Sequence, residues 1–166
     1  SDVVLLAQNQ CSSGGSAVLV VSTDGGQPTV TARLALSGYI MESRLVGTAL
    51  YVATQTYRQQ DGTNLWEWGT LVSSFDLADP KAPVARNTLW YSGYGNVVSA
   101  NDTLLFVVTQ DPNDWWRSVV RAIDITAPDG TMASYQSVNT AGRVPDKFKL
   151  RWHNGVLTTI SEDWRT

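Results

Sequence analysis

The chain has 166 residues, of which 43% are hydrophobic and only 16% charged, and its formal net charge at pH 7 is −3. This composition excludes a disordered chain, and the acidic balance argues against a nucleic-acid partner, which would require clustered lysines and arginines. No apolar run reaches the roughly 20 residues of a membrane helix, so the sequence predicts no membrane span.

Short strands separated by turn signals are predicted along the chain. The best-defined unit has strands at 39–46, 49–57, 70–77 and 84–91, which are rich in β-branched and aromatic residues. Turn residues such as Asp61-Gly62 separate these strands. Because no stretch of about a dozen residues carries a helical pattern, the sequence predicts an all-β fold.

The sequence repeats itself after 55 residues. Residues 24–55 align with residues 79–110 without a gap, and 11 of the 32 positions are identical. The identities include Ser-Gly-Tyr near the middle of each segment and Thr-Gln at its end. A further match, at an offset of 48, relates residues 71–77 to 119–125. A period of about 50 residues with four short strands in each unit is typical of a β-propeller blade.

The repeat divides the chain into four segments. Residues 1–36 are predicted to form a partial blade, 37–91 and 92–141 two full blades, and 142–166 a further partial blade. Closed propellers contain about four to eight blades. The sequence therefore predicts about three four-stranded antiparallel blades of a β-propeller. This partial ring would be a fragment of a larger propeller, or a second chain would complete it.

Several segments resemble a known family. The segment ESRLVG at 42–47 followed by LYVAT at 50–54, the FDL-x-DP motif at 75–80, and residues 146–165 are similar to secreted bacterial and archaeal proteins with a C-terminal β-propeller domain distantly related to WD repeats. The resemblance implies a secreted or envelope-associated propeller, and it implies no catalytic residues.

The expected propeller channel supplies the first candidate site. The first strand of each blade lines the channel, where ligands usually bind. Charged pairs on these strands either hold neighbouring blades in register or bind a ligand. If the chain acted on polysaccharide, Glu42 and Asp146 would be the general acid and base. The candidate channel residues are Glu42, Arg44, Asn96, Asp146 and Lys149.

Tryptophans in two predicted loops supply the second candidate site. Residues 57–68 and 111–116 are interpreted as long polar loops that carry Trp66 and Trp115 at positions that do not recur between repeats. Exposed indoles stack on sugar rings or anchor protein partners, so these two residues are candidate contacts for a glycan or a protein. The recurrent tryptophans are instead interpreted as packing between blades: Trp68, Trp116 and Trp164.

No cofactor is predicted. The segment DPND at 111–114 offers oxygens that suit Ca²⁺, but the full spaced ligand set is missing, so a plain turn is favoured. The single cysteine, Cys11, is interpreted as an idle thiol. The sequence thus predicts a non-catalytic binding or scaffold module, secreted or held at the cell envelope. The alternative is a hydrolase or lyase that acts on polysaccharide.

Overall fold

The computed structural model describes residues 1–8 and 15–165, apart from the side chain of Asn96, and Cys11 therefore lies outside the described residues. The described residues confirm the all-β prediction, since strands and a single short 3₁₀ turn, η1 (Lys147–Lys149), make up the regular structure. No helix among them is long and apolar enough to cross a membrane.

The strands form four antiparallel sheets, which we number 1 to 4 along the chain. Within each sheet, strands that follow one another in the sequence are hydrogen-bonded neighbours. Sheet 1 contains β1 (Asp2–Ala7), β2 (Ser16–Ser22) and β3 (Thr29–Leu36). Sheet 2 contains β4 (Tyr39–Val46), β5 (Ala49–Gln59), β6 (Trp66–Asp76) and β7 (Val84–Ser92).

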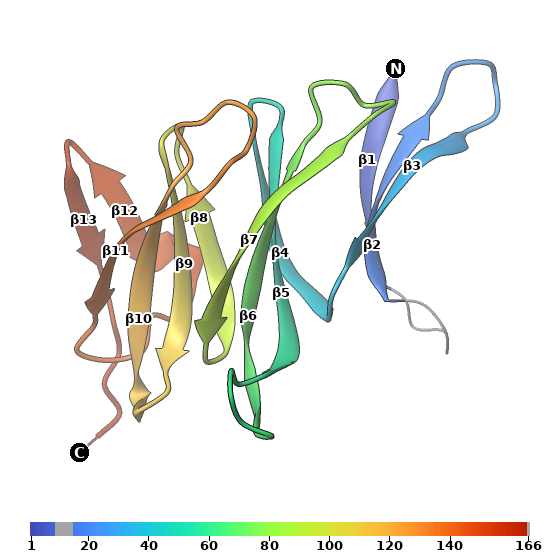
Figure 1. The fold of residues 1–166 in the computed structure, drawn as a ribbon. Coiled ribbons are helices and arrows are strands. Elements are labelled where there is room, and N and C mark those ends of the chain that lie inside the picture. Colours follow the sequence, from blue (N-terminus) through green and yellow to red (C-terminus); the bar gives the residue numbers. More distant parts are fainter. Residues whose placement is uncertain (9–14, 166) are drawn as a thin grey trace.

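Sheets 3 and 4 continue the same order. Sheet 3 contains β8 (Gly95–Ala100), β9 (Leu104–Asp111), β10 (Asp114–Asp124) and β11 (Ala133–Asn139), and sheet 4 contains β12 (Leu150–His153) and β13 (Val156–Thr159). The sheets stand side by side in chain order, with the two termini at opposite ends of the row (Figure 1). The described residues thus form an open row of sheets and no closed ring.

Each seam between neighbouring sheets has its own hydrophobic cluster. In β5, Ala49, Tyr51 and Ala53 pack toward sheet 3, whereas Leu50 and Val52 pack toward sheet 1. The same alternation occurs in β9, whose successive side chains pack in turn toward sheets 2 and 4. Because successive side chains of a strand point to opposite faces, these two strands are buried on both sides.

The repeated sequence motif marks the points where the chain crosses between sheets. Gly38 and Gly93, the glycines of the two Ser-Gly-Tyr triplets, have φ values of 79° and 95°, a region that L side chains rarely adopt. A Cβ atom at either glycine would overlap the backbone carbonyl of the repeated glutamine, Gln55 or Gln110. The repeat therefore encodes a close backbone approach that only glycine permits.

Three predictions of local structure are wrong. Residues 111–116 are not a long loop, because β9 runs to Asp111 and β10 begins at Asp114. Residues 57–68 are not one long loop, because β5 and β6 remain paired as far as Gln59 and Trp66. The rings of Tyr57 and Trp68, which are opposite one another, lie 4.3 Å apart and extend the hairpin. Residues 146–149 are not strand either: the Asp146 carboxylate accepts a hydrogen bond from the Phe148 amide, and this caps the 3₁₀ turn that precedes β12.

Candidate functional site

The predicted channel residues are only partly brought together. Arg44 of β4 donates from Nη1 to Glu42 Oε1 over 2.9 Å, and it also donates to the carbonyl of Val98 in β8. Lys147 Nζ of η1 lies 3.8 Å from Glu42 Oε2. These contacts join sheet 2 to sheet 3 and to the segment before sheet 4.

The protonation of Glu42 does not suit a general acid. Burial acts to raise its pKa, but the hydrogen bond from Arg44 and the charges of Arg44 and Lys147 outweigh burial and hold the pKa below its usual value. Asp146 caps the 3₁₀ turn and Lys149 lies within it, so neither residue lies on the predicted strand. Asn96 lies in β8, but its side chain is not described.

The two candidate tryptophans differ in their surroundings. Trp66 is 67% exposed at the start of β6, where it pairs with Gln59. Trp115 is 72% exposed at the start of β10, and it borders a groove between sheets 2 and 3. Of the recurrent tryptophans, Trp68 is half-buried, whereas Trp116 and Trp164 are exposed. The exposure of Trp116 and Trp164 disagrees with the packing role predicted for them, and Trp68 packs against Tyr57 within its own sheet.

The groove beside Trp115 has a volume of about 420 Å³. We call it the aromatic groove. Its aromatic walls are formed by side chains from both sheets, and its polar groups come from β7 and β9. The residues that define it are Trp68, Tyr94, Trp115, Ser92, Gln110 and Asp111.

Backbone and side-chain hydrogen bonds fix the shape of the aromatic groove. The Gly93 amide donates to the Trp68 carbonyl over 3.3 Å, and the Gln110 amide donates to the Tyr94 carbonyl over 2.7 Å. Gln110 Nε2 in turn donates to the Trp115 carbonyl over 3.0 Å. The Trp115 backbone is therefore held to the same β9 residue that fixes Tyr94.

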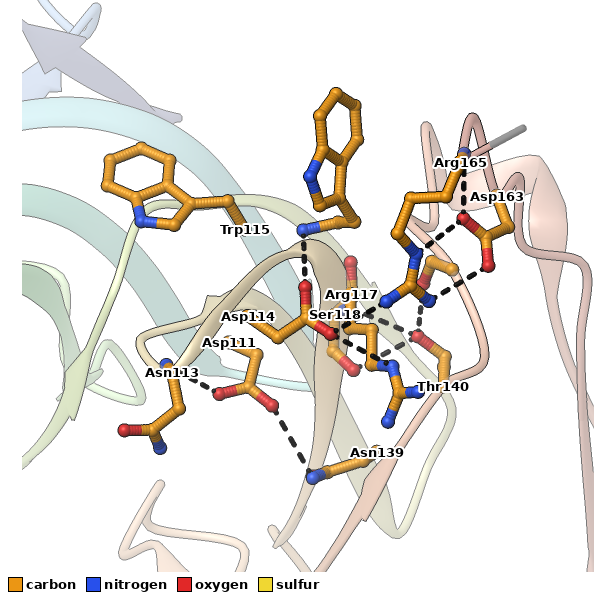
Figure 2. A network of polar contacts seen from close by, with 12 residues as sticks. Asp111, Asn113, Asp114, Trp115, Arg117, Ser118, Asn139, Thr140, Asp163 and Arg165 are labelled. Atoms are coloured by element: carbon orange, nitrogen blue, oxygen red, sulfur yellow. Dashed lines mark hydrogen bonds and ion pairs between the residues drawn. The ribbon is translucent and has the colours of Figure 1, made fainter.

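Asp111 supplies a carboxylate to the groove. Its Oδ1 accepts a hydrogen bond from the Asn113 amide over 2.9 Å, and its Oδ2 accepts one from Asn139 Nδ2 over 3.5 Å (Figure 2). These two bonds fix the orientation of the carboxylate, and Asp111 is 8% exposed. Among the described residues it is the one carboxylate that lines the groove. Glycoside hydrolysis requires a pair of carboxyl groups, so this arrangement favours binding over catalysis.

A network of ion pairs holds the turn that carries Trp115. Asp114 Oδ2 lies 3.2 Å from both Arg117 Nε and Arg165 Nη1, and Asp114 Oδ1 accepts from the Trp116 amide (Figure 2). The hydrogen bonds from the Arg165 side chain and backbone lower the pKa of Asp163 from 3.8 to about 2. Because the Asp114 carboxylate already pairs with two guanidinium groups, it is a poor ligand for Ca²⁺, and this disfavours a calcium site at residues 111–114.

Several groups of this site are not evident from the sequence. Gln110 and Asp111 lie beside Trp115 because β9 and β10 form one hairpin, and Tyr94 is held there by the hydrogen bond from the Gln110 amide to its carbonyl. Trp68 joins them because sheets 2 and 3 are neighbours. Tyr94 and Gln110 belong to the repeated motif, which the sequence analysis interpreted as a signal of the fold alone. The sequence offered one signal for these groups: a recurrent motif whose residues lie beside a tryptophan that does not recur.

Comparison of the chain with protein-family models, with curated proteins and with solved structures returned no match.

Proposed function

We propose that this chain is a non-catalytic carbohydrate-binding module whose ligand occupies the aromatic groove. The observation that carries the proposal is Trp115, an exposed indole whose backbone is fixed by Gln110 beside the buried carboxylate of Asp111. Indole and phenol faces pack on the C–H faces of sugar rings. A carboxylate accepts hydrogen bonds from sugar hydroxyl groups, and an amide side chain can both accept and donate them. The groove offers both kinds of contact.

The architecture supports a wider proposal, that the four sheets are consecutive blades of a β-propeller. Tandem antiparallel meanders that pack face to face agree with a propeller arc. Sheets 1 and 4 expose apolar side chains such as Val3, Leu5, Val156 and Ile160, which a neighbouring blade would cover. The remaining blades would come from a larger protein or from a second chain, and the whole would work outside the cell or at its envelope.

Binding to an oligosaccharide array tests the proposed ligand class. The wild-type chain should bind a subset of the immobilised glycans, and Trp115→Ala should lower that binding about five- to thirtyfold, since stacking on an aromatic side chain contributes about 1–2 kcal/mol. Trp66→Ala is the matched control, because Trp66 is equally exposed but does not line the groove. Absence of glycan binding, or equal losses in the two variants, would contradict the proposal.

Sedimentation equilibrium tests how the ring is completed. Self-association of the chain would support a second copy as the completing chain. A chain that stays monomeric at high concentration would instead assign the missing blades to other parts of a larger protein.

A further inference from the structure

Arg121 is a half-buried arginine that has no carboxylate partner among the described residues. It lies in β10, and its guanidinium stands 4.8 Å above the ring of Tyr91 in β7, across the seam between sheets 2 and 3. Its Nε atom is buried without a hydrogen-bond partner. By contrast, Arg44, Arg58 and Arg86 each form an ion pair with an acidic side chain.

The environment of Arg121 is unfavourable for a lone cation. Burial is the main influence on this guanidinium and lowers its pKa below the ordinary value, although the negative charge of Asp111 acts in the opposite direction. An arginine stays protonated even so, and a desolvated charge without a partner destabilises the folded chain. An anion bound against the guanidinium would compensate that cost.

A pocket of about 300 Å³ opens beside the guanidinium. Apart from Arg121, its polar lining consists of neutral donors and acceptors, and no acidic side chain contributes to it. The Tyr91 hydroxyl and Ser134 Oγ lie 3.5 Å apart at its wall. Guanidinium and hydroxyl donors together suit a carboxylate or a sulfate, which accept several hydrogen bonds at once. The polar residues are Tyr91, Arg121, Ser134, Gln136 and Ser137.

The pocket and the aromatic groove lie on the same seam. Tyr91 of the pocket and Ser92 of the groove are consecutive residues of β7, and the groove residue Asp111 is close enough to influence the charge of Arg121. A ligand that extends along the seam would therefore meet aromatic walls first and a cation next.

We propose that Arg121 forms an anion subsite that binds the carboxylate or sulfate group of an acidic polysaccharide lying in the aromatic groove. This inference rests on the proposed carbohydrate-binding function for the nature of the ligand. The anion subsite itself does not depend on it, because the unpartnered guanidinium and its pocket are present whatever the groove binds.

Titration with inorganic sulfate and with acetate, followed by NMR of the Arg121 Nε–H group, tests the anion subsite directly. We expect a saturable change in the chemical shift of this group with one or both anions, and their relative strength separates sulfate from carboxylate recognition. Arg33→Met is the control, since Arg33 is an exposed arginine of β3, and it should leave the titration unchanged. A shift that grows linearly without saturation, or no shift at all, would overturn the subsite without bearing on glycan binding.

Matched pairs of glycans test the ligand class. Trigalacturonate and its methyl ester share one sugar chain and differ in whether the carboxyl groups are charged, and sulfated and unsulfated forms of one oligosaccharide form a second such pair. The acidic member of a pair should bind about tenfold more tightly, because a hydrogen bond to a charged group contributes roughly 1.5–3 kcal/mol. Arg121→Met should abolish this preference, whereas Arg121→Lys should retain part of it and Arg33→Met all of it.

The outcomes separate the two proposals. Equal affinity of the acidic and neutral members for the wild-type chain overturns the acidic ligand class and leaves carbohydrate binding standing. Failure of every glycan to bind overturns the proposed function, and the sulfate and acetate titration then still decides the anion subsite. Because these comparisons use the wild-type chain, they hold even where an Arg121 variant fails to fold.

Discussion

The glutamines that end the repeated Thr-Gln pair have different partners in sheets 2 and 3. Gln55 is 1% exposed, and its Nε2 donates to Thr70 Oγ1 over 2.7 Å and to the Gly95 carbonyl over 3.3 Å. Gln110 is half-buried, and its Nε2 donates to the Trp115 carbonyl at the aromatic groove. The backbone crossing is alike at both positions. The repeated motif therefore determines how the backbone crosses between sheets, whereas the glutamine side chain can contribute to packing in one sheet and to binding in the other.

The crossing glycines carry the largest expected effect. Gly38→Ala and Gly93→Ala should each lower the free energy of unfolding by roughly 3 kcal/mol or more, because the added Cβ overlaps a backbone carbonyl and φ is positive. Gly62→Ala is the control, with a φ of 73° but no atom within 4 Å of the added carbon, and should cost about 1 kcal/mol. Urea unfolding measures all three. Similar losses at the three glycines would show that only φ matters, and the shared crossing would lose its importance.

The two glutamines should differ next. Gln55→Ala removes two buried hydrogen bonds, one to Thr70 within sheet 2 and one to Gly95 of sheet 3, and leaves a cavity, so it should cost about 2 kcal/mol of unfolding free energy. Gln110→Ala should cost only about 0.5 kcal/mol, because its amide is partly solvated. Its effect should appear instead as weaker glycan binding through a less ordered Trp115. Equal destabilisation by both substitutions would remove the distinction between the two sheets.

The smallest effect concerns the ion pairs beside each hairpin. In sheet 2 the pair Arg58–Glu67 is local to the β5–β6 hairpin, whereas in sheet 3 Asp114 pairs with Arg165 near the end of the chain. Arg165 also depresses the pKa of Asp163 to about 2. A carboxyl whose pKa is lower when folded stabilises the fold above its ordinary pKa of 3.8, and this contribution is lost as the pH falls toward 2.

NMR titration of the Asp163 carboxyl measures this contribution. The wild-type midpoint should lie near pH 2, and Arg165→Ala should raise it toward 3.8. Because both side chains are exposed at the surface, the effect on stability should be slight. An unchanged midpoint in the variant would show that the Arg165 side chain does not lower the pKa of Asp163.

The fold followed from the sequence more closely than the site did. The predicted strand at 39–46 coincides with β4, and that at 84–91 differs from β7 by one residue, because alternation and flanking turns are local signals. The 3₁₀ turn at Lys147–Lys149 was missed because a single capping aspartate, Asp146, decides it. In the sequence, an aspartate that caps a 3₁₀ turn cannot be told apart from an acidic residue at the start of a strand.

The site required knowledge of which sheets are neighbours. Trp115 stood out as a non-recurrent tryptophan, but its position beside Trp68 depends on the seam between sheets 2 and 3, and its position beside Asp111 depends on the turn of the β9–β10 hairpin. Arg121 looks ordinary in the sequence, since nothing local shows that it lies over Tyr91 and that no described carboxylate forms an ion pair with it. Contacts between elements, not properties of one element, distinguish these residues.

The two-sided burial of β5 and β9 has a consequence for how the chain avoids misalignment while it folds. In most sheets a slip by one residue is penalised because it moves apolar side chains into water. In these strands the slip would only exchange one apolar set for another, such as Ala49 and Tyr51 for Leu50 and Val52. Hydrophobicity alone therefore does not discriminate against the shifted pairing. The glycines at 38 and 93 discriminate against it, because in a shifted alignment a bulkier neighbour would overlap the opposing carbonyl. Two residues without side chains therefore determine the register in which these strands pair.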